Sequence, residues 1–275
     1  PHEVSACEDV ASWWPQLMAN SRAWPIPIDR AMAGGYAADR LAWAFASGYQ
    51  AALLALVPDL PPDTMVALCV TEAEGNTPRA IRSSLRRAYN GFVLDGNKRW
   101  TTLGPSGGLF LVAARDEAAC GERVALRLAR VASNSPGVRI EPMPPTRFVP
   151  EVPHAQLHFE AVRVAPEDLL PGDGYDLYVK RFRTVEDVHV NAAMLAYLVR
   201  EAGRLGWPED WIERTLAVLR AARTLALDNP ASPAVHIALA GALALVKTLV
   251  REAEGEWAKT VDDPGFTRWQ RDRDL

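Results

Sequence analysis

The spacing of hydrophobic residues changes twice along the chain. Residues 38–57 are rich in Ala and Leu and are followed by Pro58, which predicts a helix with a firm C-terminal end. From Met65 to Val164 the apolar runs are short and several alternate with polar residues, a pattern typical of β-strands. After Gly174 the helical spacing returns and continues to the end of the sequence.

Turn signals divide the middle region. Asn90–Gly91 and Asp95–Gly96 lie beside apolar segments and are typical hairpin-turn dipeptides, so we expect a turn at each. Five prolines crowd residues 142–153, which predicts an extended surface loop there.

The C-terminal part predicts three helices. They comprise residues 216–227, residues 234–252 and a stripe at helical spacing made of Val185, Val188, Ala192, Leu195 and Val199. Helices, then strands, then helices argue for distinct layers or domains, because a parallel Rossmann sheet would need strands and helices to alternate. We therefore predict an α+β multi-domain fold with N-terminal helices in residues 1–62, a β-barrel or sandwich in residues 63–176 and a helical bundle in residues 177–275.

Composition and charge exclude several classes of protein. With 275 residues, 49% of them hydrophobic and 23% charged, the chain resembles an average soluble globular protein. Lys and Arg number 30 against 34 Asp and Glu, so the net charge of -4 offers no positive field to nucleic acid. Three cysteines, Cys7, Cys69 and Cys120, lack close spacing and indicate a reducing compartment. Apolar residues 51–57 and 237–246 are too few to span a bilayer and no signal-peptide pattern is present, so we expect a cytoplasmic protein without a membrane partner.

Four segments of the middle region resemble the middle domain of the acyl-CoA dehydrogenases. They are Leu68–Glu72 (Leu-Cys-Val-Thr-Glu), Gly75, Gly91–Thr102 (Gly-Phe-Val-Leu-Asp-Gly-Asn-Lys-Arg-Trp-Thr-Thr) and Leu109–Arg115 (Leu-Phe-Leu-Val-Ala-Ala-Arg). In that family a Cys-Val-Thr-Glu segment, a Trp-containing hairpin and an apolar strand follow one another in this order and at comparable spacing. The family also has helices, a β-barrel and helices in sequence, so the resemblance, which covers residues 40–250, implies a shortened, divergent member.

The resemblance implies a flavin site. In the family, the Val-Thr of the first segment and the Trp-x-Thr of the second lie along the isoalloxazine ring of FAD. This correspondence puts Val70 and Thr71 at one edge of the ring and Trp100 and Thr102 on its other side. The residue types suit the task, since hydroxyl and backbone N–H groups can bond a flavin and an indole can cover its face. Taken alone, Thr71 and Trp100 would be ordinary strand residues.

The reaction of this family needs a carboxylate base, because a proton leaves the carbon α to a thioester while hydride leaves the β carbon. In one branch of the family the catalytic glutamate lies at the start of the first helix after the barrel. Glu186 has the corresponding place and is our candidate catalytic base. The alternative is structural: Thr184 and Asp187 resemble a capping box, and an acid in a first turn complements the helix dipole. We interpret His189 as structural or solvent-facing.

The loop after the first segment holds the candidate substrate-binding residues. Gly75 and Asn76 stand where the family has a serine-containing loop, one residue longer, that holds acyl-CoA or cofactor phosphates. Arg79 begins a cluster of four arginines that could grip the CoA phosphates, and the alternative is a solvated basic patch. His154 and His158 lie four residues apart without a third ligand, so they predict no metal site.

The outer half of the cofactor site departs from the family. There an Arg-x-x-Phe-Gly segment and a glutamine reach the pyrophosphate and adenine of FAD, and a Gly-Gly-x-Gly turn completes the pocket. This chain has Leu205–Pro208 at the first place, an acid, Glu213, near the second, and no counterpart of the turn. Two functions stay open. One is an acyl-CoA dehydrogenase-like flavoprotein oxidoreductase with FAD as hydride acceptor, and the other is a degenerate homologue, a binding or assembly protein with weak or no FAD binding.

The expected partners follow from the same resemblance. The small-molecule partner is an acyl-CoA or a similar thioester. Family members pair through their C-terminal helices, and the Ala-rich residues 234–250 suit close helix packing, so we expect a homodimer or homotetramer.

Overall fold

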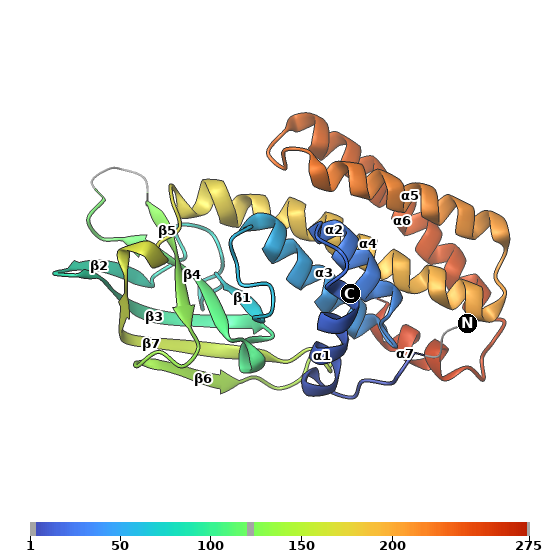
Figure 1. Cartoon of the computed structure of the whole chain (residues 1–275), viewed down its shortest axis with the longest axis horizontal. Helices are drawn as coiled ribbons and strands as arrows, with labels where there is room; N and C mark the ends of the chain where they lie inside the picture. The colour runs from blue at the N-terminus through green and yellow to red at the C-terminus, as the bar shows by residue number, and fades with distance from the viewer. Residues whose placement is uncertain (1–3, 120–123, 274–275) are drawn as a thin grey trace. The chain divides into compact units, whose positions relative to one another are not determined.

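The computed structural model describes residues 4–119 and 124–273, which form two compact units. The helical unit comprises Pro1–Asp59, Thr146–Val152 and Arg183–Leu275, and the β unit comprises Leu60–Pro145 and Pro153–Phe182. The succession of helices, strands and helices confirms the predicted α+β multi-domain fold (Figure 1). Cys7 and Cys69 are buried and free, and Cys120 lies outside the described residues.

The predicted helices are confirmed at both ends of the chain. The helices are α1 (Val10–Ser21), α2 (Pro27–Tyr36), α3 (Leu41–Leu56), α4 (Lys180–Leu205), α5 (Glu209–Leu227), α6 (Pro233–Trp257) and α7 (Pro264–Asp272). Helix α3 ends where the Val57 N–H bonds the Leu53 carbonyl at 2.9 Å, directly before Pro58, which has no N–H to continue the helix.

A cluster of tryptophans anchors the C-terminal helices. Trp257 of α6 stacks on Trp269 of α7 with ring centroids 4.9 Å apart, and its edge contact with Trp207 has a centroid distance of 5.3 Å. Trp207 in turn meets Trp211 of α5 at 5.1 Å, and the Trp211 indole donates to the Leu249 carbonyl at 3.1 Å. All four indoles are buried. Since each aromatic pair contributes about 0.5–1.5 kcal/mol beyond its buried area, the cluster holds α5, α6 and α7 together.

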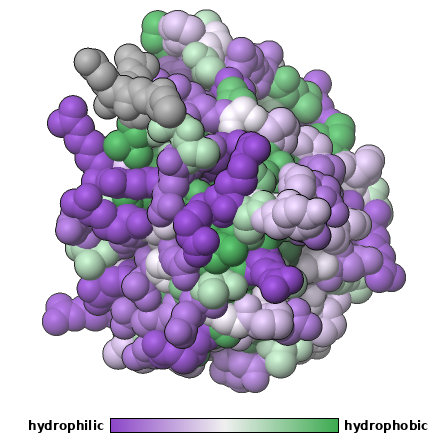
Figure 2. Space-filling model, turned by 90° about the vertical axis from the view of Figure 1, so that its left-hand side faces the viewer, coloured by the Kyte–Doolittle hydropathy of each residue, from purple (hydrophilic) through white to green (hydrophobic). Residues whose placement is uncertain are grey.

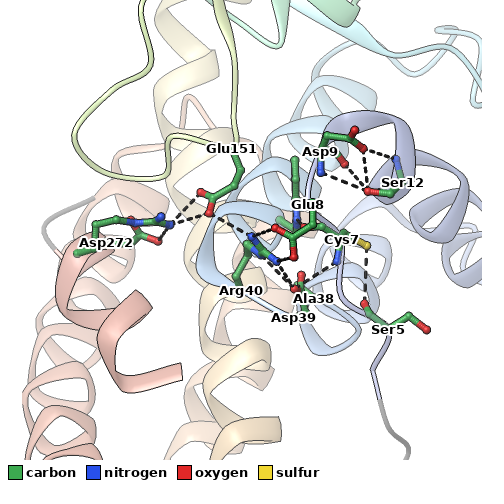
Figure 3. A network of polar contacts seen from close by, with 12 residues as sticks. Ser5, Cys7, Glu8, Asp9, Ser12, Ala38, Asp39, Arg40, Glu151 and Asp272 are labelled. Atoms are coloured by element: carbon green, nitrogen blue, oxygen red, sulfur yellow. Dashed lines mark hydrogen bonds and ion pairs between the residues drawn. The ribbon is translucent and has the colours of Figure 1, made fainter. Parts of the chain in front are cut away.

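A buried arginine gathers distant segments of the helical unit. Arg40, at the start of α3, contacts Glu8 at 3.0 Å, Asp39 at 2.8 Å and Glu151 at 3.3 Å (Figure 3). Arg271 of α7 reaches both carboxylate oxygens of Glu151 at 2.9 Å. A buried guanidinium needs such partners to offset its desolvation. The network therefore joins the N-terminal segment, the start of α3 and the loop of Glu151 to α7.

The proline-rich segment is more than the surface loop that we predicted. Val149 and Val152 are 1% and 0% exposed, and Val149 has a φ of +40°, which is unfavourable for a β-branched residue. Its N–H donates to Oδ1 of Asp272 on α7 at 2.8 Å. The prediction is therefore wrong for this part of the segment, because two buried valines and a carboxylate of α7 hold it inside the helical unit.

Helix α6 is apolar and has little burial. By length and composition its 25 residues could cross a membrane. The sequence prediction considered only the apolar residues 237–246, which are too few to do so, because the helix extends beyond them at both ends. A single helix of this kind is weak evidence for a membrane span. Ile237 and Leu245 are 76% and 56% exposed on its surface. The helix thus has an apolar face that the helical unit itself does not cover.

The β unit contains one mixed sheet in a half-barrel arrangement. Its strands are β1 (Val66–Cys69), β2 (Ser84–Ala88), β3 (Gly91–Thr102), β4 (Leu109–Asp116), β5 (Leu126–Ala132), β6 (Val138–Pro142) and β7 (His154–Val164). The strand order is β1-β4-β2-β3-β7-β6, with β5 paired to β4. Strands β1 and β2 run parallel to β4, and the other pairs are antiparallel. Leu85, Leu94, Phe110 and Leu157 lie in its hydrophobic core.

One of the two predicted turns is present. The Asn90–Gly91 dipeptide lies in the β2–β3 hairpin, where Ala88 pairs with Gly91. The turn predicted at Asp95–Gly96 is wrong, since both residues lie inside β3 at a shift of register against β7. Gly96 has a φ of +146°, and a Cβ there would lie 2.2 Å from Oγ of Ser83. The glycine is therefore required by a bulge and a close approach, not by a chain reversal.

Candidate functional site

Two segments of the β unit meet at the candidate flavin site. Val70 and Thr71 follow β1, and the Thr71 carbonyl accepts a hydrogen bond from the Arg99 N–H of β3 at 2.8 Å. Nζ of Lys98 lies 3.3 Å from the Val70 carbonyl. These contacts hold Val70 and Thr71 beside the β3 residues that lead to Trp100. The structure thus brings together two groups of predicted residues that are about 30 positions apart in the chain.

A buried ion pair lies next to this junction. Nζ of Lys98 is 2.7 Å from Oε1 of Glu72, with the side chains 0% and 8% exposed. Glu72 also accepts from the Arg82 N–H at 2.6 Å and from the N–H and hydroxyl of Ser83 at 3.0 and 2.7 Å. Burial acts to raise the pKa of Glu72, but the ammonium and these hydrogen bonds outweigh it and lower the pKa overall. The network keeps Glu72 ionised and holds the residues after β1 against Lys98 of β3.

The end of β3 presents Trp100 and Thr102. The ladder with β7 shifts register between Lys98 and Thr101, and Trp100 has a φ of +55°. Bulges of this kind redirect side chains, and the indole is 51% exposed. His154 of β7 lies beside it, with ring centroids 6.2 Å apart at 71°, and its Nε2 is 3.4 Å from Oγ1 of Thr102. An exposed indole, a hydroxyl and an imidazole therefore occupy neighbouring positions.

The residues present fit a flavin ring better than they fit the phosphates of FAD. The hydroxyls of Thr71 and Thr102 supply hydrogen-bonding groups, and the indole of Trp100 is an exposed flat apolar surface of the kind that covers a ring. At the place expected to contact the pyrophosphate, Trp207 is buried in the tryptophan cluster, and Glu213 is exposed on α5. Trp207 therefore contributes to the packing of the helical unit, and Glu213 places a negative charge near the place where the family has a glutamine.

The predicted substrate residues share one loop of the β unit. The N–H of Glu72 bonds the Gly75 carbonyl at 2.9 Å, and the Gly75 N–H returns to the Glu72 carbonyl at 3.1 Å. Gly75 adopts a φ of +120°, which favours glycine. Asn76 and Arg79 are exposed, and the Arg79 carbonyl accepts from Arg115 at 2.9 Å. The turn gathers Gly75, Asn76 and Arg79 on the surface.

The neighbouring arginines have local partners. Arg82 pairs with Glu74 at 2.9 Å, and Arg86 lies 4.0 Å from Asp95. Arg87 lies over the ring of a β3 phenylalanine, 5.9 Å from its centroid. Figure 2 views the molecule from the side where Figure 1 shows the strands, and most of that surface is hydrophilic. These contacts favour a solvated basic face for the three arginines after Arg79.

Glu186 belongs to the helical unit and lies on α4. Helical backbone begins before α4, in a π-helical turn at Tyr175–Val179, so Thr184 lies inside the helix and the capping-box interpretation is wrong. Glu186 is partly buried. Burial, together with the nearby Asp187, raises its pKa to about 7, while Arg183 acts to lower it. A carboxylate with this pKa suits general-base chemistry near neutral pH.

Two of the histidines are held by structural contacts. His189 is 2% exposed and its Nδ1 contacts the Val185 carbonyl at 2.7 Å. Burial lowers the pKa of His189 to about 4, so it is neutral at physiological pH. His158 lies between Oδ1 of Asn97 at 2.6 Å and Oε2 of Glu141 at 3.1 Å. In the part of the chain that the structure describes, no three His, Cys, Asp or Glu side chains form a metal-binding group.

The structure adds two residues that sequence reasoning left without a role. Lys98 lies four residues after Leu94 in the same strand, and residues separated by an even number point to the same face. This spacing from an apolar residue was the signal in the sequence that Lys98 faces the core. His154 had no such sign in the sequence. Its place beside the candidate site depends on the pairing of His154 with Thr102 across β7 and β3.

Part of the chain matches a known protein family. Residues 67–162 match the family model described as acyl-CoA dehydrogenase, middle domain. This range includes Val70, Thr71, Trp100 and Thr102. Comparison with curated protein sequences found no match.

Solved structures share the fold over most of the chain. The crystal structure of an FAD-dependent dehydrogenase has a TM-score of 0.69 at 13% identity and covers 90% of this chain and 80% of that one. FMN-bound TdsC from Paenibacillus sp. A11-2 has a TM-score of 0.70 at 15% identity, with coverage of 90% and 78%. The prolyl acyl carrier protein oxidase AnaB has a TM-score of 0.65 at 14% identity, also with 90% and 78%. The chain therefore has the acyl-CoA dehydrogenase fold, and its residues 67–162 match the middle-domain model of that family.

Proposed function

We propose that the protein is a flavin-dependent oxidoreductase of the acyl-CoA dehydrogenase type, which forms a double bond between the α and β carbons of an acyl thioester. The observation that carries the proposal is the junction of the β unit, where Val70 and Thr71 are held beside the strand that bears Trp100 and Thr102. The fold neighbours support it, because they include an FAD-dependent dehydrogenase and an FMN-bound protein.

The isoalloxazine ring is the part of the cofactor for which the chain offers contacts. Val70, Thr71, Trp100 and Thr102 would hold it, and a bound flavin would supply an acceptor for the hydride of the β carbon. FAD is the cofactor that the resemblance implies. Because Trp207 is used for packing at the expected pyrophosphate position, FMN is the second candidate, and the experiment below tests both.

Glu186 is the proposed base. Its ionised carboxylate takes the proton from the α carbon, and the electron pair of that C–H bond forms the new double bond as hydride leaves the β carbon with its own electron pair. With a pKa of about 7, the ionised form is well populated at neutral pH and remains basic enough to accept a proton. The proton and the hydride are thus both accounted for.

The thioester is an acyl-CoA or a similar substrate. Gly75, Asn76 and Arg79 share one exposed loop and are proposed to contact its phosphates through backbone N–H groups, an amide and a guanidinium. A carrier-protein thioester presents related chemistry, and the fold neighbour AnaB is described as a prolyl acyl carrier protein oxidase.

A homodimer or homotetramer is part of the proposal. The face of α6 around Ile237 and Leu245 is apolar and exposed, and a side chain at Gly241 between them would have no neighbouring atom within 4 Å of its Cβ. Small residues on such a face allow two helices to approach closely.

A second candidate function is that of a homologue without catalysis, which keeps the fold as a binding or assembly protein. The packing of Trp207 and the exposed acid Glu213 favour it, since both depart from phosphate-binding residues.

The two functions differ in one experiment, titration of the purified protein with FAD and, separately, with FMN, followed by visible absorption. The dehydrogenase predicts a bound, perturbed flavin spectrum with either cofactor, which bleaches without oxygen when an acyl-CoA is added. Trp100→Ala weakens binding, whereas Trp24→Ala, a change at an indole exposed to 47% in the helical unit, does not. A protein that leaves the spectrum of both flavins unperturbed, and that is colourless once free flavin is removed, is the non-catalytic homologue.

A further inference from the structure

A histidine with no assigned role lies against the candidate flavin site. His154 starts β7, and its register partner across the sheet is Thr102 of β3. Directly paired residues of an antiparallel ladder point to the same face, with Cβ atoms about 5 Å apart. The imidazole Nε2 accordingly lies 3.4 Å from Oγ1 of Thr102.

The position of His154 is well defined by its backbone. Its carbonyl accepts from the Met143 N–H at 2.9 Å, and the preceding Pro153 carbonyl accepts from the Leu103 N–H at 2.7 Å. The strand end is therefore held from both sides. The imidazole also meets the indole of Trp100 in an edge arrangement at 6.2 Å and 71°, a geometry that aromatic pairs favour.

The chemistry of the pair is directional. A threonine hydroxyl has one proton to donate and can accept two hydrogen bonds. When Nε2–H of His154 donates to Oγ1, the Thr102 proton stays available for an acceptor atom of a ligand. When Nε2 accepts instead, the same proton points at the imidazole and away from a ligand.

We propose that His154 is a positioning residue of the flavin site, which directs the Thr102 hydroxyl toward the cofactor by donating to its oxygen and which supports the edge of the Trp100 indole. This inference rests on the proposed function. It concerns the contacts of His154 with Thr102 and Trp100, the two residues proposed to touch the flavin.

Variants at His154 test the inference without large damage to the core. The side chain is partly exposed and is not among the buried core residues. His154→Phe keeps a ring but removes the donor, and His154→Gln restores a donor. His158→Gln is the matched control, since His158 lies on the same strand and contacts Asn97 and Glu141 instead.

The measurements are flavin affinity, the absorption spectrum and the midpoint potential of the bound flavin, with urea unfolding as a check on folding. We expect His154→Phe to bind flavin about five- to tenfold more weakly, as the loss of one hydrogen bond predicts, and to shift the spectrum and the potential. His154→Gln should recover most of each, and His158→Gln should match the unmodified protein. If His154→Phe does not fold, His154→Ala replaces it with the same expectations.

The outcomes separate this inference from the proposed function. An unmodified protein that binds neither flavin overturns both. A protein that binds flavin, but whose His154 variants keep its affinity, spectrum and potential, overturns the role of His154 alone. Equal effects of the His154→Phe and His158→Gln changes would also overturn it, because they would point to a general effect of β7.

Discussion

Replacing Glu186 by Gln should make the protein more stable at alkaline pH. The folded-state pKa is about 7, against 4.5 for an unperturbed glutamate, so the folded chain binds more protons than the unfolded chain between these two values. Stability is therefore lost as the pH rises through this window, and the full cost is present above about pH 7. A difference of about 2.5 pKa units corresponds to about 3 kcal/mol, since one unit is about 1.4 kcal/mol. Glutamine has the same shape and carries no charge.

Urea unfolding at about pH 5 and about pH 8 measures this effect. We expect Glu186→Gln to raise the free energy of unfolding by about 3 kcal/mol at the higher pH and by about 1 kcal/mol or less at the lower. Glu213→Gln, a change at an exposed position of α5, is the control and should change little at either pH. A Glu186→Gln protein with equal or lower stability at about pH 8 would refute the reasoning. That result would mean that the ionised carboxylate of Glu186 does not lower the free energy of unfolding.

Three further predictions concern the fold and the assembly. Glu72→Met should destabilise the β unit by about 4 kcal/mol, because the buried Lys98 then loses its charged partner and keeps the Val70 carbonyl at 3.3 Å. Lys98→Met should cost about 3 kcal/mol, because Glu72 keeps three donors, the Arg82 N–H and the N–H and hydroxyl of Ser83. The double variant should cost less than the sum of the two, because it removes both charges, and additive costs in urea unfolding would contradict this. Asp272→Ala should cost about 1–3 kcal/mol in the same assay, because it leaves a buried N–H of the proline-rich segment without its acceptor, and an unchanged unfolding midpoint would contradict the contact. Ile237→Glu should convert an oligomer into monomers in light scattering, and an unmodified protein that is already monomeric would contradict the assembly.

The β unit could be predicted where local signals determine structure. The Asn90–Gly91 turn and the apolar runs of β1 and β4 are set by backbone preference and alternation, so they are visible in the sequence. The parallel pairing of β1 and β2 with β4 was not predicted, because it depends on contacts between distant segments. Asp95–Gly96 was misread because a glycine at positive φ serves bulges as well as turns.

The candidate site was predicted in part for the same reason. Val70, Thr71, Trp100 and Thr102 follow motifs, so their proximity could be expected from the resemblance. The raised pKa of Glu186 depends on burial of its carboxyl in the folded chain, which no local pattern reports. His154 joins the site only through strand register, a non-local property. The roles of residues such as Glu186 and His154 depend on tertiary packing and therefore could not be derived from the sequence.

The central claim is that the junction of the β unit binds a flavin ring, and the most direct test is titration of the purified protein with FAD and with FMN under visible absorption. The account predicts saturable binding of at least one of them, a perturbed flavin spectrum, weaker binding by Trp100→Ala and unchanged binding by Trp24→Ala. A protein that leaves the spectrum of both flavins unperturbed at saturating concentration would contradict it. Flavin binding that Trp100→Ala leaves unchanged would contradict it as well.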